Sequence, residues 1–229
     1  MIHQLPVVVP GPEGEPPPGL GADHPMRLVT RAAAFEPDGW TDQRRREVAA
    51  LFDSLAEEWS SRDVPGREAP ILDALDRGLP AAPPGSRKVA VDIGAGDGLN
   101  TRHLTPAFPD LITLDLSGEM LRRAAASDER GRTLRRVRAD GSRLPMPDGS
   151  VDALVLANAF LFPAEAHRVL APAGVVVWVN SRGTGTPIHL LATEVDEALP
   201  GRWDGVASTA GWGTWSVHWR AQPSVATPK

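Results

Sequence analysis

Hydrophobic and polar positions follow two different periods along the chain. Between residues 40 and 61 apolar side chains recur every three or four residues, as on one face of an amphipathic helix. Thr41 or Asp42 is a suitable N-cap for this helix, and a second helix is expected before Pro80. Further along, short apolar runs alternate with helix-like segments. We expect strands at 88–93, 111–115, 134–139, 151–157 and 174–179, and helices at 98–107, 117–126, 163–170 and 187–199.

This alternation of strands and helices predicts an α/β protein. Strand–helix–strand units imply right-handed crossovers and a mostly parallel sheet covered on both faces. The end of the chain differs, because residues 206–221 carry Gly211 and Gly213 between two strand-like runs, as in an antiparallel hairpin. We therefore predict a doubly wound, Rossmann-like sheet of seven strands, five of them parallel, with a C-terminal hairpin and an N-terminal helical cap.

Three regions follow from the composition along the chain. Residues 1–25 contain the proline-rich run PGPEGEPPPG and are expected to form a disordered tail, because proline removes hydrogen-bond donors. Residues 26–84 are expected to form the helical cap and a linker. Residues 85–229 are expected to form the ligand-binding domain, which makes one globular unit with the cap.

The composition excludes several classes of protein. The chain has no cysteine, which removes disulfides, thiolate metal sites and cysteine nucleophiles, and no spacing of His or carboxylate residues predicts a metal site. A net charge of −5 gives no electrostatic reason to expect nucleic-acid binding. No signal peptide is visible, and no apolar run reaches the roughly 18 residues that a membrane span needs. The expected location is cytoplasmic, with no membrane partner.

The segment KVAVDIGAGDGLN, residues 88–100, carries the strongest functional signal. A short apolar strand containing Asp92 runs into Gly94, Ala95 and Gly96, followed by a third glycine and the start of a helix. A loop without side chains lets the backbone lie against a ligand at a helix N-terminus. The third glycine comes one residue earlier than in the G-x-G-x-x-G loop of dinucleotide-binding proteins.

Polar residues also follow the later strands. Asp115 ends the second strand about 20 residues after the glycines, where a carboxylate can accept hydrogen bonds from ribose hydroxyls. Asp140 and Gly141 follow the third strand, and Asn158 ends the fourth. In a doubly wound sheet these ends meet in one crevice, so we expect the polar groups to converge there.

The DIGAGDG segment resembles motif I of the class I S-adenosylmethionine-dependent methyltransferases. DGSRLPMPDGSVDALVLANAF and EAHRVLAPAGVVVWV resemble later segments of that family, in the same order. The resemblance implies S-adenosylmethionine as cofactor, with the glycine loop holding its methionine part, Asp115 its ribose, Leu116 one face of its adenine and Asp140 the adenine edge. The expected cofactor-binding residues are Asp92, Gly94, Ala95, Gly96, Asp115, Leu116, Asp140, Gly141 and Asn158.

Simpler interpretations stand beside these assignments. Asp115 could be only a polar strand end, and Asp140 with Gly141 could be a common Asp-Gly turn. Asn158 could equally well cap the backbone or face a substrate.

Catalysis by this family needs little from side chains, because the sulfonium already activates the methyl group and alignment supplies much of the acceleration. A general base is needed only if the acceptor must lose a proton, and His189 is the single weak candidate. ANAF stands where enzymes that methylate bases or glutamine would show an Asn/Asp-Pro-Pro-aromatic tetrad. The expected partner is therefore a small-molecule acceptor and not nucleic acid.

Few residues separate the fourth and fifth strands, which should leave the crevice open unless another segment covers it. We hypothesise that the helix bearing Phe52, Leu55 and Trp59 acts as a lid. Two alternatives to the enzyme remain. A nicotinamide-dependent oxidoreductase is disfavoured by the glycine spacing and by the absence of tyrosine, and a non-catalytic protein that binds the cofactor could retain the same residues.

Overall fold

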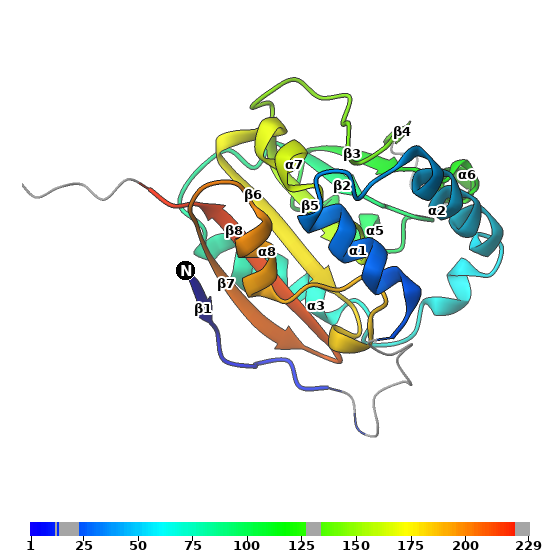
Figure 1. Ribbon diagram of the computed structural model, residues 1–229. Helices are drawn as coiled ribbons and strands as arrows, with labels where there is room; N and C mark the ends of the chain where they lie inside the picture. Colours follow the sequence, from blue (N-terminus) through cyan, green and yellow to red (C-terminus); the bar gives the residue numbers. More distant parts are fainter. Residues whose placement is uncertain (12, 14–22, 127–133, 223–229) are drawn as a thin grey trace, which may run out of the picture.

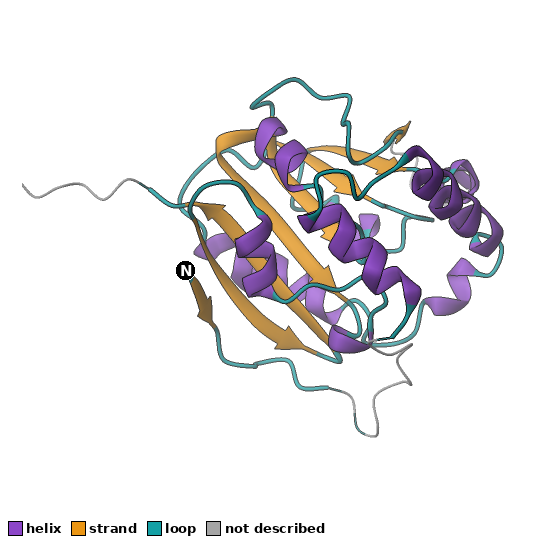
Figure 2. Cartoon of the chain, viewed as in Figure 1, coloured by secondary structure: helices purple, strands orange, loops and turns teal. Residues whose placement is uncertain are grey.

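A mixed eight-stranded sheet with helices on both faces forms the centre of the protein (Figure 1; Figure 2). The computed structural model describes residues 1–11, 13, 23–126 and 134–222. The strands are β1 (Ile2–Gln4), β2 (Val89–Ile93), β3 (Asp110–Asp115), β4 (Arg135–Arg138), β5 (Val151–Ala157), β6 (Leu170–Asn180), β7 (Trp203–Ala210) and β8 (Gly213–Arg220).

The order of strands across the sheet is β1-β7-β8-β6-β5-β2-β3-β4. Each neighbouring pair is parallel except the two that involve β8, which runs antiparallel to β6 and β7. From β2 the chain proceeds outward through β3 to β4, then returns to β5 on the other side of β2. The order therefore reverses between β2 and β5, where a doubly wound sheet binds its ligand.

The helices lie on both faces of this sheet (Figure 2). They are α1 (Pro25–Phe35), α2 (Asp42–Leu55), α3 (Ala69–Asp73), α4 (Leu79–Ala81), α5 (Thr101–Leu104), α6 (Gly118–Ala126), α7 (Pro163–Val169) and α8 (Ala192–Ala198), with 3₁₀ turns η1 (Trp59–Arg62) and η3 (Gly183–Gly185) and a π-helical turn η2 (Ala74–Gly78).

Separate apolar clusters cover the two faces of the sheet. One cluster packs α1, α7 and α8 against the sheet, and the other packs α3, η2 and α5 against it. The central strands β2 and β5 are nearly continuous apolar runs, because a parallel strand covered on both faces has no solvent side. These two layers hold the carboxyl ends of the parallel strands at one rim of the sheet.

A third, smaller apolar cluster lies over that rim. It joins Val48 of α2 to Phe160 and Ile188 of the loops that follow β5 and β6, with Trp40 and Phe52 packed against it. Figure 1 shows α2 beside α6 at this end of the sheet, with α1 across the front. The N-terminal helices thus reach the site expected at the strand ends.

The predicted α/β sheet with a C-terminal hairpin is confirmed, but the number of strands is eight and not seven. The extra strand, β1, pairs Ile2 with Gly205 of β7. The expectation of a disordered tail over residues 1–25 is therefore wrong for this strand, because an edge strand needs only one hydrogen-bonding side and three residues can supply it. Residues 12 and 14–22 of that expected tail lie outside the described residues.

Several helix boundaries also differ from the prediction. α5 begins at Thr101 and not at residue 98, because Gly98 has a φ of +90°, which is incompatible with a helix. α8 begins at Ala192 and not near 187, and α1 had no counterpart among the predicted elements. The predicted N-cap Thr41 is confirmed, since its side chain accepts a hydrogen bond from the Arg44 amide at 3.1 Å.

Candidate functional site

A cavity with an empty volume of about 810 Å³, partly open to solvent, lies at the carboxyl ends of the central strands. Side chains and backbone from the ends of β2, β3 and β5 form its floor, and the N-terminal helices form its roof. Eight of the nine predicted cofactor-binding residues line it. They are Gly94, Ala95, Gly96, Asp115, Leu116, Asp140, Gly141 and Asn158.

The glycine loop presents bare backbone to this cavity. The Gly94 and Ala95 amides donate to the Leu114 carbonyl at 2.8 and 3.1 Å, which ties the loop to the neighbouring strand. Gly94 and Gly96 have φ values of +66° and +59°, in the left-handed region that favours glycine. A side chain on Gly94 would also put its Cβ only 2.8 Å from the Ala159 Cβ. The loop therefore offers a cradle that other residues would fill.

Asp115 links the end of β3 to the glycine loop. Its Oδ2 accepts from the Gly96 amide and its Oδ1 from the Ser117 amide, both at 2.8 Å. Burial raises the pKa of this carboxyl, against the opposing effect of the hydrogen bonds from Ser117 and Gly96. The carboxylate retains lone pairs beyond those two bonds, so it can still accept from a ligand in the cavity.

Asp140 also lines the cavity, two residues after the end of β4. The Trp40 Nε1 donates to both of its oxygens, at 3.1 Å to Oδ1 and 3.0 Å to Oδ2, and the Ser142 amide donates to Oδ1 at 2.8 Å. Arg45 approaches Oδ2 at 3.8 Å. A Cβ on Gly141 would lie 3.2 Å from the Phe162 ring, so glycine lets the aromatic ring approach.

Asn158 has a backbone function as well as a place in the cavity wall. It adopts a φ of +55°, and its Oδ1 accepts from the Ser181 amide at 2.9 Å while its Nδ2 donates to the Ser181 Oγ at 3.1 Å. These bonds join the ends of β5 and β6. The interpretation of Asn158 as a backbone cap is therefore confirmed.

Asp92, the ninth predicted cofactor-binding residue, is not among the residues that line the cavity. Successive side chains of a strand point to opposite faces, and the next residue, Ile93, is the one that lines the cavity. Asp92 is buried and accepts from the Thr101 Oγ at 2.7 Å. Burial raises its pKa to about 7, opposed by the Thr101 bond and reinforced by Asp115.

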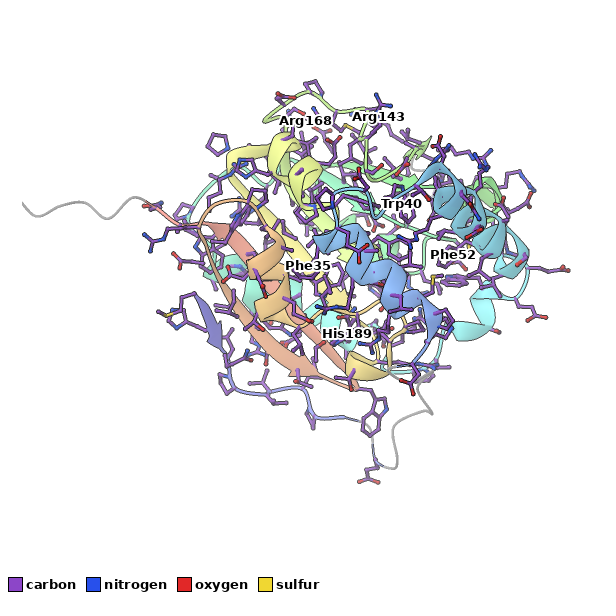
Figure 3. The ribbon with its side chains drawn as sticks, in the orientation of Figure 1. Phe35, Trp40, Phe52, Arg143, Arg168 and His189 are labelled. Atoms are coloured by element: carbon purple, nitrogen blue, oxygen red, sulfur yellow. The ribbon has the colours of Figure 1, made fainter. Side chains whose placement is uncertain are left out.

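His189, the candidate general base, also lies outside the cavity wall, although its neighbour Ile188 is part of it. Figure 3 places it in the loop that leads into α8. Burial lowers the pKa of His189 to about 4, reinforced by Arg27 and opposed by Glu194. The imidazole is therefore neutral near pH 7, and it is not among the residues that line the cavity.

Aromatic side chains form the part of the cavity that was least predictable. Phe52 and Trp59 of the proposed lid line it and pack edge to face, with ring centroids 5.7 Å apart, whereas Leu55 does not line it. Phe160 and Phe162 follow β5, and Trp40, which Figure 3 labels, packs on both. The helical period of residues 40–61 predicted that Phe52 and Trp59 share one face. No local pattern marks Trp40, because the residues it contacts lie about 100 or more positions away along the chain.

Charged side chains are few on the wall of this cavity. Among the described lining residues they are Arg67, Asp97, Asp115 and Asp140. Neither Arg67 nor Asp97 is among the site residues predicted from the sequence. Burial raises the pKa of Asp97, while Arg67 acts to lower it. Within the described ranges no cluster of three His, Cys, Asp or Glu residues could hold a metal ion, and no helix is long and apolar enough to cross a membrane.

A glycine cradle and two strand-end carboxylates around one cavity define a Rossmann-like protein that binds a nucleoside-containing cofactor. A family model described as "Methyltransferase domain" matches residues 91–178. A demethylmenaquinone methyltransferase of Renibacterium salmoninarum is 30% identical over 175 residues, which cover 69% of this chain and 70% of the relative. This chain therefore belongs to the class I S-adenosylmethionine-dependent methyltransferases, and S-adenosylmethionine is its cofactor.

A second curated relative and two solved structures are also similar to this chain, and the solved structures agree with it in fold. A demethylmenaquinone methyltransferase of Beutenbergia cavernae is 31% identical over 156 residues, which cover 62% of this chain and 60% of that protein. The solved DhpI–SAH complex aligns with a TM-score of 0.60 and 20% identity over 78% of this chain and 98% of the other. A Methanococcus maripaludis structure titled "putative s-adenosyl-l-methionine-dependent methyltransferase" gives a TM-score of 0.52 and 16% identity, covering 80% of this chain and 95% of the other.

Proposed function

We propose that this methyltransferase acts on a small, largely apolar acceptor held between the glycine loop and the N-terminal helices. The observation that carries the proposal is the aromatic wall. Five aromatic side chains line the cavity, three from the N-terminal helical region and two from the segment after β5. Aromatic and apolar walls with a few placed polar groups are typical of sites for small organic ligands.

The cofactor fits the floor of this cavity. We propose that the backbone of Gly94, Ala95 and Gly96 receives the methionyl part, that Asp115 accepts from the ribose, and that Asp140 accepts from the adenine amino group. Leu116 and Gly141 would contact the adenine ring. The cradle that a Cβ on Gly94 would fill and the two carboxylates with free lone pairs support this assignment.

The names of the relatives favour one chemical class of methyl acceptor. Both curated relatives are demethylmenaquinone methyltransferases, and the aromatic wall of this cavity suits a flat ring of that kind. We therefore favour a ring acceptor of the quinol or phenol type over an aliphatic one. The sequence ANAF after β5 also favours a small-molecule acceptor, since it lacks the tetrad of enzymes that methylate bases or glutamine.

Bound S-adenosylmethionine supplies a methyl group that its sulfonium already activates. The chain contributes the rest by holding the cofactor on the glycine loop, placing the acceptor ring against the aromatic wall and excluding water beneath α2. No histidine lines the described cavity wall. The proposal therefore assigns the acceleration to alignment and desolvation, and the proton that a quinol or phenol loses on methylation leaves to solvent at the open side of the cavity.

Two polar contacts join the proposed lid to the floor. Asp53 of α2 accepts from the Ser117 Oγ, and also from the Glu119 amide at 3.2 Å, at the start of α6. A Cβ on Gly96 would lie 3.4 Å from the Trp59 Nε1, so the roof approaches the glycine loop closely. We propose that α2 and η1 close over the cofactor as a lid, with α2 anchored at Asp53.

Transfer of labelled methyl groups tests the acceptor class. The protein is incubated with methyl-labelled S-adenosylmethionine and, separately, with naphthoquinols, phenols, aliphatic amines, a protein mixture and RNA. We expect label in the ring compounds alone. Label in protein or RNA would contradict a small-molecule acceptor, and cofactor binding without turnover on any acceptor would favour the non-catalytic alternative.

A further inference from the structure

We propose that Trp40 is a positioning residue for the adenine of the cofactor, and that it makes the site selective for a 6-amino purine over a 6-oxo purine. The inference rests on the proposed role of Asp140 at the adenine edge. Trp40 lies outside the segment that the methyltransferase family model matches. It would therefore be a feature that the N-terminal helices add to a widespread fold.

The indole N–H of Trp40 restrains the Asp140 carboxylate. It lies 3.1 and 3.0 Å from the two oxygens, so it bridges them, and the Ser142 amide holds Oδ1 from a second direction at 2.8 Å. Two carboxylate oxygens offer about four lone-pair positions, and these donors use only part of them. The remaining lone pairs have a fixed direction, because rotation of the carboxylate would break both bonds.

The indole ring is itself held in place. Its centroid lies 5.4 Å from that of Phe160 and 5.1 Å from that of Phe162, in tilted and edge-on contacts. The preceding residue, Gly39, closes a tight turn after α1, and a Cβ there would lie 2.1 Å from the Ala32 carbonyl oxygen. The following residue, Thr41, caps α2. Trp40 is therefore positioned before any ligand arrives.

Charge around Asp140 reinforces its role as an acceptor. Arg45 of α2 lies 3.8 Å from Oδ2, with 37% of its side chain exposed, and also contacts Asp42 at 3.2 Å. This exposed contact adds little binding energy. The protein groups named here all donate to Asp140, so a ligand group at its remaining lone pairs must also be a donor.

The selectivity follows from the chemistry of the purine. A 6-amino group donates a hydrogen bond to the restrained carboxylate, whereas a 6-oxo group presents an acceptor and leaves an unfavourable contact between two oxygens. With Trp40 in place the carboxylate cannot turn away from that contact. Without the indole N–H it can rotate, and the penalty for the 6-oxo purine should fall.

Titration calorimetry with S-adenosylhomocysteine and its deaminated analogue, S-inosylhomocysteine, tests this inference. We expect the wild type to bind the amino form at least about tenfold more tightly. Trp40→Phe keeps an aromatic ring but removes the N–H, and we expect it to reduce the ratio of the two affinities at least about threefold. Trp40→His retains a ring N–H and should recover part of the ratio.

Trp59→Phe is the matched control, because Trp59 also lines the cavity but lies at the glycine loop. It should change the affinity for both ligands by the same factor. If Trp40→Phe keeps the wild-type ratio while Asp140→Asn loses it, the role of Trp40 is wrong and that of Asp140 stands. If Asp140→Asn also keeps both affinity and ratio, the proposed adenine site itself is wrong.

A measurement on the wild type covers the case in which Trp40→Phe does not fold. The indole N–H resonance of Trp40 in a ¹⁵N-labelled sample should shift strongly on addition of S-adenosylhomocysteine and weakly with S-inosylhomocysteine. Equal shifts with both ligands would overturn the proposal. The Asp140→Asn variant identifies the resonance, since it alters the acceptor of that proton.

Discussion

Two buried carboxyl groups at the glycine loop show how neighbouring residues of one type acquire different roles. Asp115 ends its strand, binds the Gly96 amide and lines the cavity. Asp92 lies one position before the end of its own strand, and therefore points away from the cavity to Thr101. Position relative to the strand end, and not residue type, separates the candidate ligand group from the structural one.

Asp92→Asn should change how stability depends on pH. The pKa of Asp92 is raised from 3.8 to about 7 in the folded protein, so the folded state binds more protons than the unfolded chain across that range. The contribution of Asp92 to stability is therefore lost as pH rises toward 7. The variant lacks this loss. The difference in unfolding free energy between variant and wild type should therefore shift in favour of the variant by about 1 to 3 kcal/mol from pH 5 to pH 8.

Urea unfolding of both proteins at the two pH values measures this difference. Comparing the two proteins cancels the pH dependence of groups that both contain. If the difference in unfolding free energy between variant and wild type is the same at pH 5 and pH 8, Asp92 has an ordinary pKa.

His189→Gln should leave methyl transfer nearly unchanged. The side chain is buried outside the cavity wall, and a pKa near 4 makes it neutral at working pH. Removal of a true general base costs about 10²- to 10⁴-fold in rate. We expect kcat within about threefold of wild type and an unchanged pH profile, and a loss of a hundredfold would restore His189 as the base.

At the scale of elements, α2 connects the N-terminal region to each part of the floor. Its N-terminal neighbour Trp40 binds Asp140, its Asp53 binds the start of α6, and Trp59 beyond its end lies over the glycine loop. The apolar period of residues 40–61 predicted this helix, and Phe52 lines the cavity. The same period could not separate Leu55 from the lining residues, because the side that faces a ligand depends on what the helix packs against.

Phe52→Ala should weaken cofactor binding if α2 acts as a lid. Loss of the ring removes apolar surface from the roof, and we expect the dissociation constant of S-adenosylhomocysteine to rise about three- to tenfold. Leu51→Ala is the matched control, since Leu51 is the preceding residue of the same helix and is exposed. Its affinity should equal that of the wild type, and equal losses in both variants would argue against a lid.

At the scale of the molecule, the N-terminus closes the outer edge of the sheet. The Met1 ammonium donates to the Trp203 carbonyl at 2.6 Å and to Asp204 at 2.9 Å, and the Leu5 amide donates to the Ala207 carbonyl at 2.8 Å. β1 lies at the end of the strand order, with β7, β8, β6 and β5 between it and β2. Its contribution should therefore be to stability rather than to ligand binding.

A variant lacking residues 2–5 tests this separation. Thermal unfolding should show a melting temperature lower by about 3 to 8 °C, because the edge strand and its hydrogen bonds are lost. The affinity for S-adenosylhomocysteine should stay within about twofold of wild type, because four strands separate β1 from β2 and the glycine loop. An unchanged melting temperature would contradict the pairing of β1 with β7.

The limits of sequence analysis have a physical origin. The parallel strands and the hairpin were predictable because burial on both faces and the turn glycines leave local patterns. β1 was not, because three residues beside a proline-rich run carry no period. The cavity floor was predictable from strand ends, whereas Trp40 was not, because its partner Asp140 lies 100 positions away and the contact forms only in the folded chain.

A crystal structure of the complex with S-adenosylhomocysteine tests the central claim most directly. The account predicts the ligand in the cavity under α2, with its ribose hydroxyls at Asp115, its adenine amino group at Asp140 and its methionyl part along Gly94–Gly96. A ligand bound elsewhere, or bound in this cavity without contact to either carboxylate, would contradict it.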